Sequence, residues 1–444
     1  MKMKRFFVSC IGFIALMTSQ NVHAQQEQSL IFMTDVWQSN LLNPALLPEK
    51  KYTIALPSVY FNLYSPDVTI NDLVVTNSES GKRRLDLDTL LNSRLKESNH
   101  FDANVHLQTF GLTFPVSKKF SLTLSHGVFG DPSVTGRRDL LRLIVKGNAQ
   151  FLAKTTAFGG TADGSVRSEF AIGGTYKLPM ITVGARIKFL YGISAIFTPT
   201  GKLDIGFNPN DYSVRFINDF DIRTFDIDKL NNLNSIPDLL KNGGTSNNKG
   251  IGIDIGGTMK LGKIQLNASL LDVSSTIKWK SGGTSYSSKG DFTYTGMNAG
   301  GRDQFFRWDS LSSKSFRDTL KKLIAYKEVN SGVTYDQKLP TRLYLSGSYE
   351  VNSTLQVSAM FYSEIRPEES RTGFMLDATA KVLKVVRIGA TFGLRNGGFD
   401  NLGGHISAKL GPVHLFAVTD NMLTIFKPYD AHKTNGRIGG SISF

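Results

Sequence analysis

The stretch Ile181-Thr182-Val183-Gly184-Ala185-Arg186-Ile187-Lys188-Phe189 decides the fold, because apolar residues alternate along it with polar or small ones. Successive side chains of an extended strand point to opposite faces, so this stretch has one apolar and one polar face. The same alternation recurs at 264–270, 355–361, 374–382 and 386–394. Runs of roughly nine to eleven residues are longer than a usual strand of about five or six. The pattern therefore predicts β-strands that cross a membrane.

The connections between these strands distinguish a membrane barrel from a soluble secreted β-protein, which is the competing class. Very short links occur near 116–119, 178–180, 261–263, 352–353 and 411–412. Long polar segments alternate with them near 65–100, 130–165, 195–249, 274–339 and 420–435. Short turns at one end and long loops at the other are typical of outer-membrane barrels.

We expect about 14 strands, an even number as in bacterial outer-membrane barrels. They are predicted near 52–64, 103–115, 119–129, 166–177, 180–191, 249–260, 263–273, 340–350, 354–364, 371–382, 386–395, 402–410, 412–419 and 436–444. Short periplasmic turns would place both chain ends in the periplasm. The predicted fold class is all-β, a transmembrane antiparallel outer-membrane β-barrel over residues 52–444, with an N-terminal plug and short helices in its extracellular loops.

Residues 1–24 are predicted to be a cleaved signal peptide. Basic residues at positions 2, 4 and 5 precede an apolar run at 6–17 that is too short to span a bilayer. Small residues then favour cleavage between Ala24 and Gln25. The single cysteine, Cys10, lies within this segment, so we expect a mature protein in the outer membrane with no disulfide and no thiolate ligand.

Residues 25–51 are predicted to form a plug folded into the lumen. Trp37 and the run Asn43-Pro44-Ala45 mark this segment, and its leucines at 41, 42, 46 and 47 favour burial. The alternative is a disordered leader. A plug also gives a reason for the glycine-rich strand 250–257, which lacks the spacing of a phosphate-binding loop and permits close packing or strong curvature.

The chain ends on an alternating strand that places Ile438, Gly440, Ile442 and Phe444 on one face. A terminal strand ending on an aromatic residue resembles the signal that outer-membrane barrels present to the barrel assembly machinery. Helical periodicity appears within three of the long segments, at 140–152, 227–236 and 316–324. We expect these helices to cover the barrel mouth; the alternative is a docking surface.

No catalytic, metal-binding or cofactor-binding residues are predicted. The histidines at 100, 106, 126, 405, 414 and 432 lack the spacing of a helical zinc motif, and no nucleophile-elbow motif is present. The net charge of +14 comes from dispersed Lys and Arg residues, which does not favour nucleic-acid binding. Cations in extracellular loops fit the phosphates of lipopolysaccharide, so outer-membrane lipids are predicted partners.

A resemblance to known barrels rests on two parts of the chain. They are Asn43-Pro44-Ala45 and the closing stretch from Thr419-Asp420-Asn421 through Lys427-Pro428-Tyr429-Asp430 to Phe444. With these features the chain resembles an uncharacterised outer-membrane barrel family of Bacteroidetes and is similar to the long-chain fatty-acid transporter superfamily. The resemblance implies a roughly fourteen-stranded barrel with a luminal plug. Some relatives import hydrophobic compounds, and others are accessory barrels of the type IX secretion apparatus.

The leading hypothesis is a porin-like channel or transporter for small hydrophobic molecules, and not an enzyme. One alternative is a non-transporting accessory barrel that binds proteins of a secretion or surface complex. The other alternative is an outer-membrane barrel enzyme, with a site assembled across strands from luminal Ser and His residues. The strand pattern itself does not choose between them.

Overall fold

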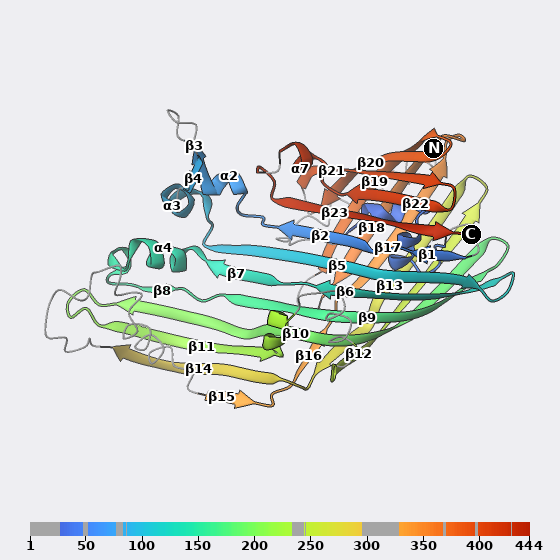
Figure 1. The fold of residues 1–444 in the computed structure, drawn as a ribbon. Coiled ribbons are helices and arrows are strands. Elements are labelled where there is room, and N and C mark those ends of the chain that lie inside the picture. The colour runs from blue at the N-terminus through green and yellow to red at the C-terminus, as the bar shows by residue number, and fades with distance from the viewer. Residues whose placement is uncertain are drawn as a thin grey trace, which may run out of the picture.

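The computed structural model describes residues 27–47, 52–76, 83–85, 87–232, 244, 246–294, 328–366, 370–395, 398–427 and 429–444. The predicted signal peptide, with Ala24 and Gln25, lies outside these ranges and stays a prediction. The described chain is a closed antiparallel barrel with a wall of 14 strands, which confirms the predicted fold class (Figure 1).

The wall strands follow one another in chain order, and each pairs with its neighbours. They are β1 (Thr53–Ala55) with β2 (Ser58–Tyr64) as the first strand, β5 (Ser98–Pro115), β6 (Phe120–Gly130), β9 (Thr161–Lys177), β10 (Ile181–Phe207), β12 (Asn248–Leu261), β13 (Ile264–Trp279), β17 (Thr341–Glu350), β18 (Leu355–Ile365), β19 (Ser370–Leu383), β20 (Val386–Arg395), β21 (Gly398–Leu410), β22 (Val413–Thr419) and β23 (Lys433–Ser443). The barrel closes where β23 pairs with β1, Thr53 opposite Ser443, and with β2, Val59 opposite Ile438.

The wall is apolar outside and polar inside. On β10 the outward residues Val183 and Ile187 are 46% and 50% exposed, whereas the inward residues Arg186 and Lys188 are each 5% exposed. The same distribution holds on β12, where Ile253 and Ile255 face outward. Exposed aliphatic side chains around a buried polar interior are unfavourable in water and are the arrangement of barrels surrounded by lipid. The fold is therefore that of outer-membrane β-barrels.

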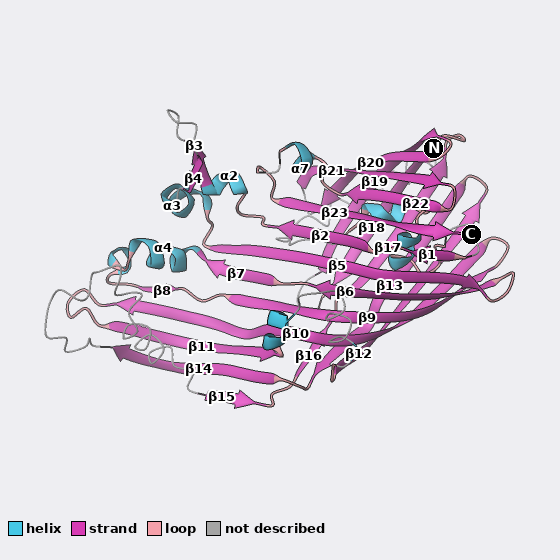
Figure 2. Ribbon diagram, in the orientation of Figure 1, coloured by secondary structure: helices cyan, strands magenta, loops and turns pink. Residues whose placement is uncertain are grey.

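Additional strands extend the barrel at the end opposite the short turns (Figure 2). They are β7 (Ser133–Arg137), β8 (Thr155–Ala157), β11 (Val214–Phe225), β14 (Gly283–Tyr294), β15 (Glu328–Ser331) and β16 (Tyr335–Lys338), with the separate hairpin β3 (Val74–Thr76) and β4 (Arg83–Leu85). The outer half of β10 pairs with β11, and β11 pairs with β14 along its whole length. The expectation of polar loops at 195–249 and 274–339 is therefore wrong for much of the described chain, because strands beyond the membrane need no apolar face.

Short helices occur in the long connections at the end of the barrel opposite the short turns. They are α2 (Ile70–Leu73), α3 (Leu87–Thr89), η3 (Leu90–Arg94), α4 (Arg138–Lys146), η4 (Ala149–Phe151), η5 (Ile227–Asn232) and α7 (Leu423–Phe426). Helices thus form at the first two predicted sites, and 316–324 lies outside the described residues. Of the apolar face of α4, Leu140 and Leu143 pack against a buried cluster around Phe151, while Leu141 and Ile144 are exposed.

Within the described ranges, no helix is long and apolar enough to cross a membrane.

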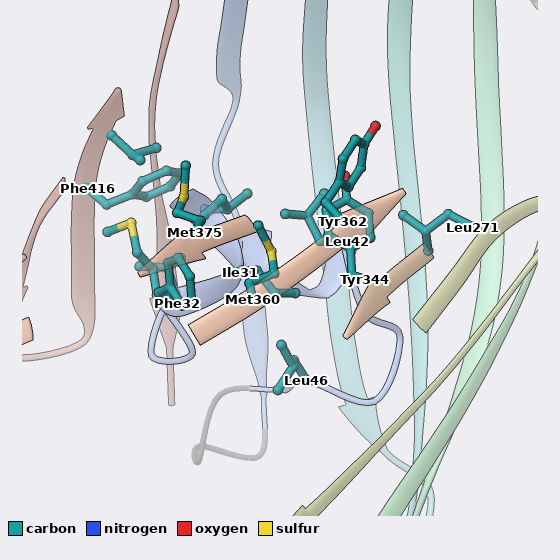
Figure 3. Close-up of a cluster of buried hydrophobic side chains, with 14 residues drawn as sticks. Ile31, Phe32, Leu42, Leu46, Leu271, Tyr344, Met360, Tyr362, Met375 and Phe416 are labelled. Carbon is teal, nitrogen blue, oxygen red and sulfur yellow. The ribbon is translucent and has the colours of Figure 1, made fainter. Parts of the chain in front are cut away.

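Residues 27–47, here called the luminal segment, lie inside the barrel. The segment contains two 3-10 turns, η1 (Ser29–Phe32) and η2 (Trp37–Leu41), and its residues are buried or half-buried throughout. In Figure 3 its side chains Ile31, Phe32 and Leu42 lie among inward-facing residues from several wall strands. Those wall residues are Leu271, Tyr344, Met360, Tyr362, Met375 and Phe416. Side chains alone fill a barrel of about eight strands, so a wider one has room for such a segment.

Candidate functional site in the lumen

Trp37 anchors the luminal segment to β5. Its ring is fully buried, and its Nε1 donates a hydrogen bond of 2.8 Å to Thr113 Oγ1. A Cβ atom at Gly111 would lie 2.3 Å from the Trp37 ring, so only glycine leaves space for the indole at that position. The predicted plug residue Trp37 is therefore held by one hydrogen bond, and its ring occupies the space that Gly111 leaves free on the wall.

Asn43 orders the next turn of the segment and binds a different part of the wall. Its Oδ1 accepts a hydrogen bond of 2.9 Å from the backbone N–H of Ala45, which fixes a local turn. Its Nδ2 donates to the backbone oxygens of Gly257 (3.2 Å) and Ala268 (3.4 Å) on β12 and β13. Asn43 thus connects the luminal segment directly to the main chain of two paired strands.

Two inward-facing glycines form the surface on which Asn43 and Pro44 rest. Gly184 and Gly256 are directly paired between β10 and β12. A Cβ at Gly184 would approach the Pro44 carbonyl to 2.4 Å, and one at Gly256 would approach Asn43 Oδ1 to 2.1 Å. The Pro44 carbonyl also accepts a hydrogen bond of 2.9 Å from Thr175 Oγ1. The glycine-rich strand 250–257 therefore packs closely against the luminal segment at this point.

Wall side chains satisfy the backbone carbonyls that η2 leaves free at its end. Arg186 donates to the carbonyl oxygens of Asn40 (3.2 Å) and Leu41 (3.0 Å), and Ser269 Oγ donates to that of Leu42 (2.6 Å). A buried carbonyl without a partner costs about 1–3 kcal/mol, so these donors make the buried position of the segment favourable. The polar interior of the barrel acts here as a hydrogen-bonding surface for the segment.

Two carboxylates, one on each side of the contact, hold the beginning of the segment to the wall. Asp420, at the end of β22, accepts hydrogen bonds from the backbone N–H groups of Gln28 (3.3 Å) and Ser29 (2.9 Å). Glu27 of the segment forms a buried ion pair with Arg437 of β23, 2.7 Å between Nε and Oε2. Asp420 belongs to the closing stretch that carries the resemblance described above, and its position gives that stretch a structural role.

Asp35 supplies a third polar anchor in the middle of the segment. Its carboxylate accepts a hydrogen bond of 2.9 Å from Ser407 Oγ and lies 3.3 Å from His414 Nε2 and 3.8 Å from Arg387. Burial alone would raise the pKa of Asp35. The hydrogen bond with His414 and the positive charge of Arg387 together have the larger effect and lower this pKa to about 2. Asp35 is therefore ionised at neutral pH and contacts β20, β21 and β22.

A buried ion-pair network lies beside the segment on β10, β12, β13 and β17. Arg186 Nε donates to Asp254 (2.9 Å), Lys188 Nζ lies 3.0 Å from Asp254, and both Lys188 and Arg342 contact Asp272. The pairing of β12 with β13 shifts register here, and Asp272 has a positive φ of 57°. The bulge turns the Asp272 carboxylate toward both cations. Each of the three cations thus contacts at least one of two buried carboxylates.

A small cavity of about 70 Å³ remains next to the luminal segment. Its lining combines apolar residues with polar and charged ones: Leu41, Leu42, Phe129, Ala171 and Leu271 with Glu27, His106, Gln108, Ser125, His126, Glu169, Arg186, Lys188, Arg342, Tyr344 and Arg437. Such a cavity has room for a few water molecules only. The cavity itself is therefore too small for larger solutes.

The luminal histidine His126 makes polar contacts that do not complete a Ser-His-acid triad. His126 contacts Ser168 Oγ (2.8 Å) through Nε2, but its Nδ1 meets the hydroxyl of Thr109 (2.7 Å) rather than a carboxylate. His405 Nε2 lies 2.9 Å from Asp377. Among the residues that the structure describes, no group of three or more His, Cys, Asp or Glu is arranged to hold a metal ion.

The residues predicted as the C-terminal signal lie on the wall strand β23 and at its end. Ile438 and Phe444 are each 65% exposed on the outer face, and Ile442 is half-buried beside them. The Gly440 carbonyl accepts a hydrogen bond of 2.8 Å from Gln38 Nε2 of the luminal segment. These residues therefore form part of the lipid-facing seam that closes the barrel, and recognition by the assembly machinery stays a prediction.

Sequence reasoning named the segment residues Trp37, Asn43, Pro44 and Ala45, and it expected the glycines of 250–257, which include the partner Gly256, to allow strong curvature or close packing against a plug. It missed the other partners, which are Gly111, Thr113, Thr175, Gly184, Arg186, Ser269 and Asp420. Every one except Asp420 lies on a wall strand at a position facing inward. The alternation identifies inward positions, but it carries no signal for which polar side chain meets the segment.

Similar solved structures include the toluene transporter TbuX of Ralstonia pickettii (11% identity, TM-score 0.40, 92% of this chain and 94% of that chain). A FadL homologue of Pseudomonas aeruginosa (9%, 0.44, 92% and 94%) and the toluene transporter TodX of Pseudomonas putida (10%, 0.41, 96% and 99%) are also similar. These TM-scores are low, so the barrel assignment rests on the strand pairing itself.

No curated protein matches the sequence. A family model matches residues 44–420, which begin at Pro44 in the luminal segment and end at Asp420, where that segment is held. The matched region thus contains nearly the whole wall. The chain belongs to the family of unknown function DUF5723.

Proposed function

We propose that the protein is an outer-membrane channel for small molecules that the luminal segment closes. The observation that carries this proposal is the buried segment 27–47, which hydrogen-bonds to side chains on opposite sides of the barrel. The inside-out wall supports a position in the outer membrane. Export by a cleaved signal peptide is part of the same proposal.

Many of the contacts that hold the segment, beside its apolar cluster with the wall, are hydrogen bonds, which suits an obstruction that can leave. Its carbonyls bond to Arg186, Ser269 and Thr175, and its first amides bond to Asp420. Water can replace each of these partners when the segment moves, so the net contribution of each hydrogen bond is only about 0.5–1.5 kcal/mol. The inward-facing polar residues would then line a hydrated passage.

The proposed cargo is a small hydrophobic molecule, and a buried aromatic cluster on the inner face near the outer mouth supports it. Phe197, Phe225 and Trp279 pack there with ring centroids 5.5–6.0 Å apart. The three rings are at most 5% exposed, so an apolar compound would contact them only where this cluster opens, whereas the charged residues near Arg186 would have to be desolvated to accept it. Opening of this cluster is therefore the step at which the proposed cargo would be captured.

Reconstitution in vesicles tests the channel. The mature protein and a variant lacking residues 25–47 are compared for release of a trapped small dye, and we expect faster release through the shortened variant. Deletion that leaves release at the level of empty vesicles contradicts the proposal. Uptake of hydrophobic compounds by a strain that lacks the protein tests the cargo. If this strain takes up every tested compound normally, the proposal of a hydrophobic cargo is contradicted.

Purification in mild detergent tests the accessory-barrel alternative. A channel should be isolated without other proteins, whereas an accessory barrel of a secretion complex should bring partner proteins in fixed ratio.

A further inference from the structure

The connection between β22 and β23 folds over the outer face of the barrel. The backbone N–H of Met422 donates a hydrogen bond of 2.6 Å to the Leu402 carbonyl on β21. Gly404 shares the outward face of β21 with Ile406, which is 44% exposed, because His405 between them points inward to Asp377. A Cβ at Gly404 would lie 2.9 Å from Met422 Sδ. The methionine therefore lies on the outside of the wall, over a glycine.

Hydrogen bonds give this connection a defined shape. Asn421 Nδ2 donates to the Lys433 carbonyl (3.0 Å), and Thr424 Oγ1 donates to the Asn421 carbonyl (2.8 Å). The backbone N–H of Lys427 closes α7 by donating to the Leu423 carbonyl (2.9 Å). The polar groups of the turn are thus directed inward or paired locally, and its apolar side chains remain on the outside.

The outer side of α7 is a cluster of exposed apolar residues, here called the α7 patch. Leu423 is 50% exposed, Ile425 66%, Phe426 77% and the nearby Tyr429 45%. Lys427 is exposed among them. Four large apolar side chains exposed within seven residues are unfavourable in water and mark a surface that contacts another apolar phase.

The position of the α7 patch identifies that phase. Figure 1 shows α7 beside β21 and β23, at the end of these strands away from the C-terminus. The patch continues the lipid-facing surface of the neighbouring strands, where Leu402 is 37% and Leu415 46% exposed. An apolar patch with a flanking lysine at the membrane boundary fits acyl chains together with an anionic headgroup.

We propose that the α7 patch is a binding site for a lipid of the outer leaflet. Its acyl chains pack on Leu423, Ile425 and Phe426, and Lys427 contacts its phosphate. Charge and apolar area lie side by side, as such a lipid requires. The proposal needs the barrel to lie in a membrane but does not depend on channel activity, so dye release and lipid contact can fail independently.

Fluorescence quenching tests the acyl contact. Phe426→Trp is prepared in the full-length mature protein and reconstituted in vesicles of phosphatidylglycerol brominated near the top of its acyl chains. The fluorescence that the new tryptophan adds to the unaltered protein should be lost in these vesicles and retained in unbrominated ones. If the added fluorescence is insensitive to bromine but is quenched by aqueous iodide, the patch is exposed to water and available to a protein partner. That result overturns the proposal.

Tyr212→Trp is the matched control. Tyr212 is 76% exposed in the connection between β10 and β11, at the far end of the extracellular sheet. Its tryptophan should respond to iodide and not to bromine. Faster migration of unboiled samples on a gel shows that each variant is folded before quenching is measured.

The headgroup contact is tested separately with Lys427→Gln in the Phe426→Trp protein. Quenching by brominated phosphatidylglycerol should exceed quenching by brominated phosphatidylcholine, and Lys427→Gln should remove this difference. Equal quenching by both lipids, or a difference that persists in Lys427→Gln, overturns the assignment of Lys427 to the phosphate.

Discussion

At the scale of single residues, glycine determines where the luminal segment can dock. Gly111 leaves space for Trp37, and the paired glycines Gly184 and Gly256 leave space for Pro44 and Asn43. The next inward-facing positions of β10 and β12 carry the side chains of Arg186 and Asp254, so the missing side chains at Gly184 and Gly256 define the binding surface. A methyl group added at such a position is expected to displace the luminal segment, while the wall strands keep their structure.

Gly256→Ala tests this expectation against Gly257→Ala, its neighbour on the same strand. A Cβ at 256 would meet Asn43 Oδ1 at 2.1 Å, whereas one at 257 has no neighbour closer than 3.8 Å. We expect Gly256→Ala to destabilise the docked segment by about 1–3 kcal/mol and to increase dye release from vesicles. Gly257→Ala should leave release unchanged. Equal release by the two variants would show that Asn43 does not dock as described.

The Trp37–Thr113 hydrogen bond gives a second prediction at this scale. Trp37→Phe keeps most of the ring but removes the Nε1 donor, and Thr113→Val removes the acceptor. A double-mutant cycle should give a coupling free energy of about 0.5–1.5 kcal/mol, measured by urea unfolding of the refolded barrel. Additive effects of the two substitutions would be inconsistent with a direct bond between the side chains.

At the scale of elements, the luminal segment behaves as a separate piece fastened to the wall at several points. Asp420 holds its beginning, Asp35 contacts β20 to β22, and Arg186 holds the end of η2. The contacts lie on different sides of the barrel, so release of the segment requires several of them to break together. Fixing any one end covalently should therefore prevent release.

A disulfide between Ser29→Cys and Thr391→Cys makes that test. The two hydroxyl oxygens are 3.1 Å apart, and the only native cysteine is Cys10 in the predicted signal peptide. Dye release should fall to the level of empty vesicles when the pair is oxidised and recover on reduction. Ser29→Cys alone is the control and should not respond to reductant. Unchanged release through the oxidised double variant would mean that solutes pass without movement of the segment.

The elements also show what sequence alone can and cannot predict. The wall strands were predictable because lipid requires an apolar residue at every second position, as on 181–189. The β11 and β14 strands were not, since polar residues such as Asn218 and Ser288, whose side chains hydrogen-bond across the two strands, interrupt this pattern. The burial of Trp37 and Asn43 followed from an apolar segment ahead of the barrel, but their partners depend on contacts between residues distant in sequence.

At the scale of the whole molecule, stability depends on a closed ring of strands. The first strand is divided by Pro57, which has no N–H to donate, yet both β1 and β2 still pair with β23. No edge strand remains in the wall, so backbone groups are satisfied without water. Such a ring opens only when many hydrogen bonds break together.

Mobility on a gel tests closure of the ring. The mature protein from the outer-membrane fraction should migrate faster unboiled than boiled, because the closed barrel stays compact in detergent. A truncation lacking 433–444 removes β23 and should abolish the fast form. Recovery of the intact protein from the soluble periplasmic fraction, folded without detergent, would contradict a membrane barrel.

The adjacent glycines Gly256 and Gly257 have one further consequence for experiments. One faces Asn43 and the other faces hydrocarbon, so a single peptide layer, without side chains, separates inside from outside at that spot. A nitroxide carried by a phospholipid tail should therefore broaden the NMR resonance of the Asn43 amide although that group never leaves the interior. The barrier between the two compartments is there no thicker than the main chain itself.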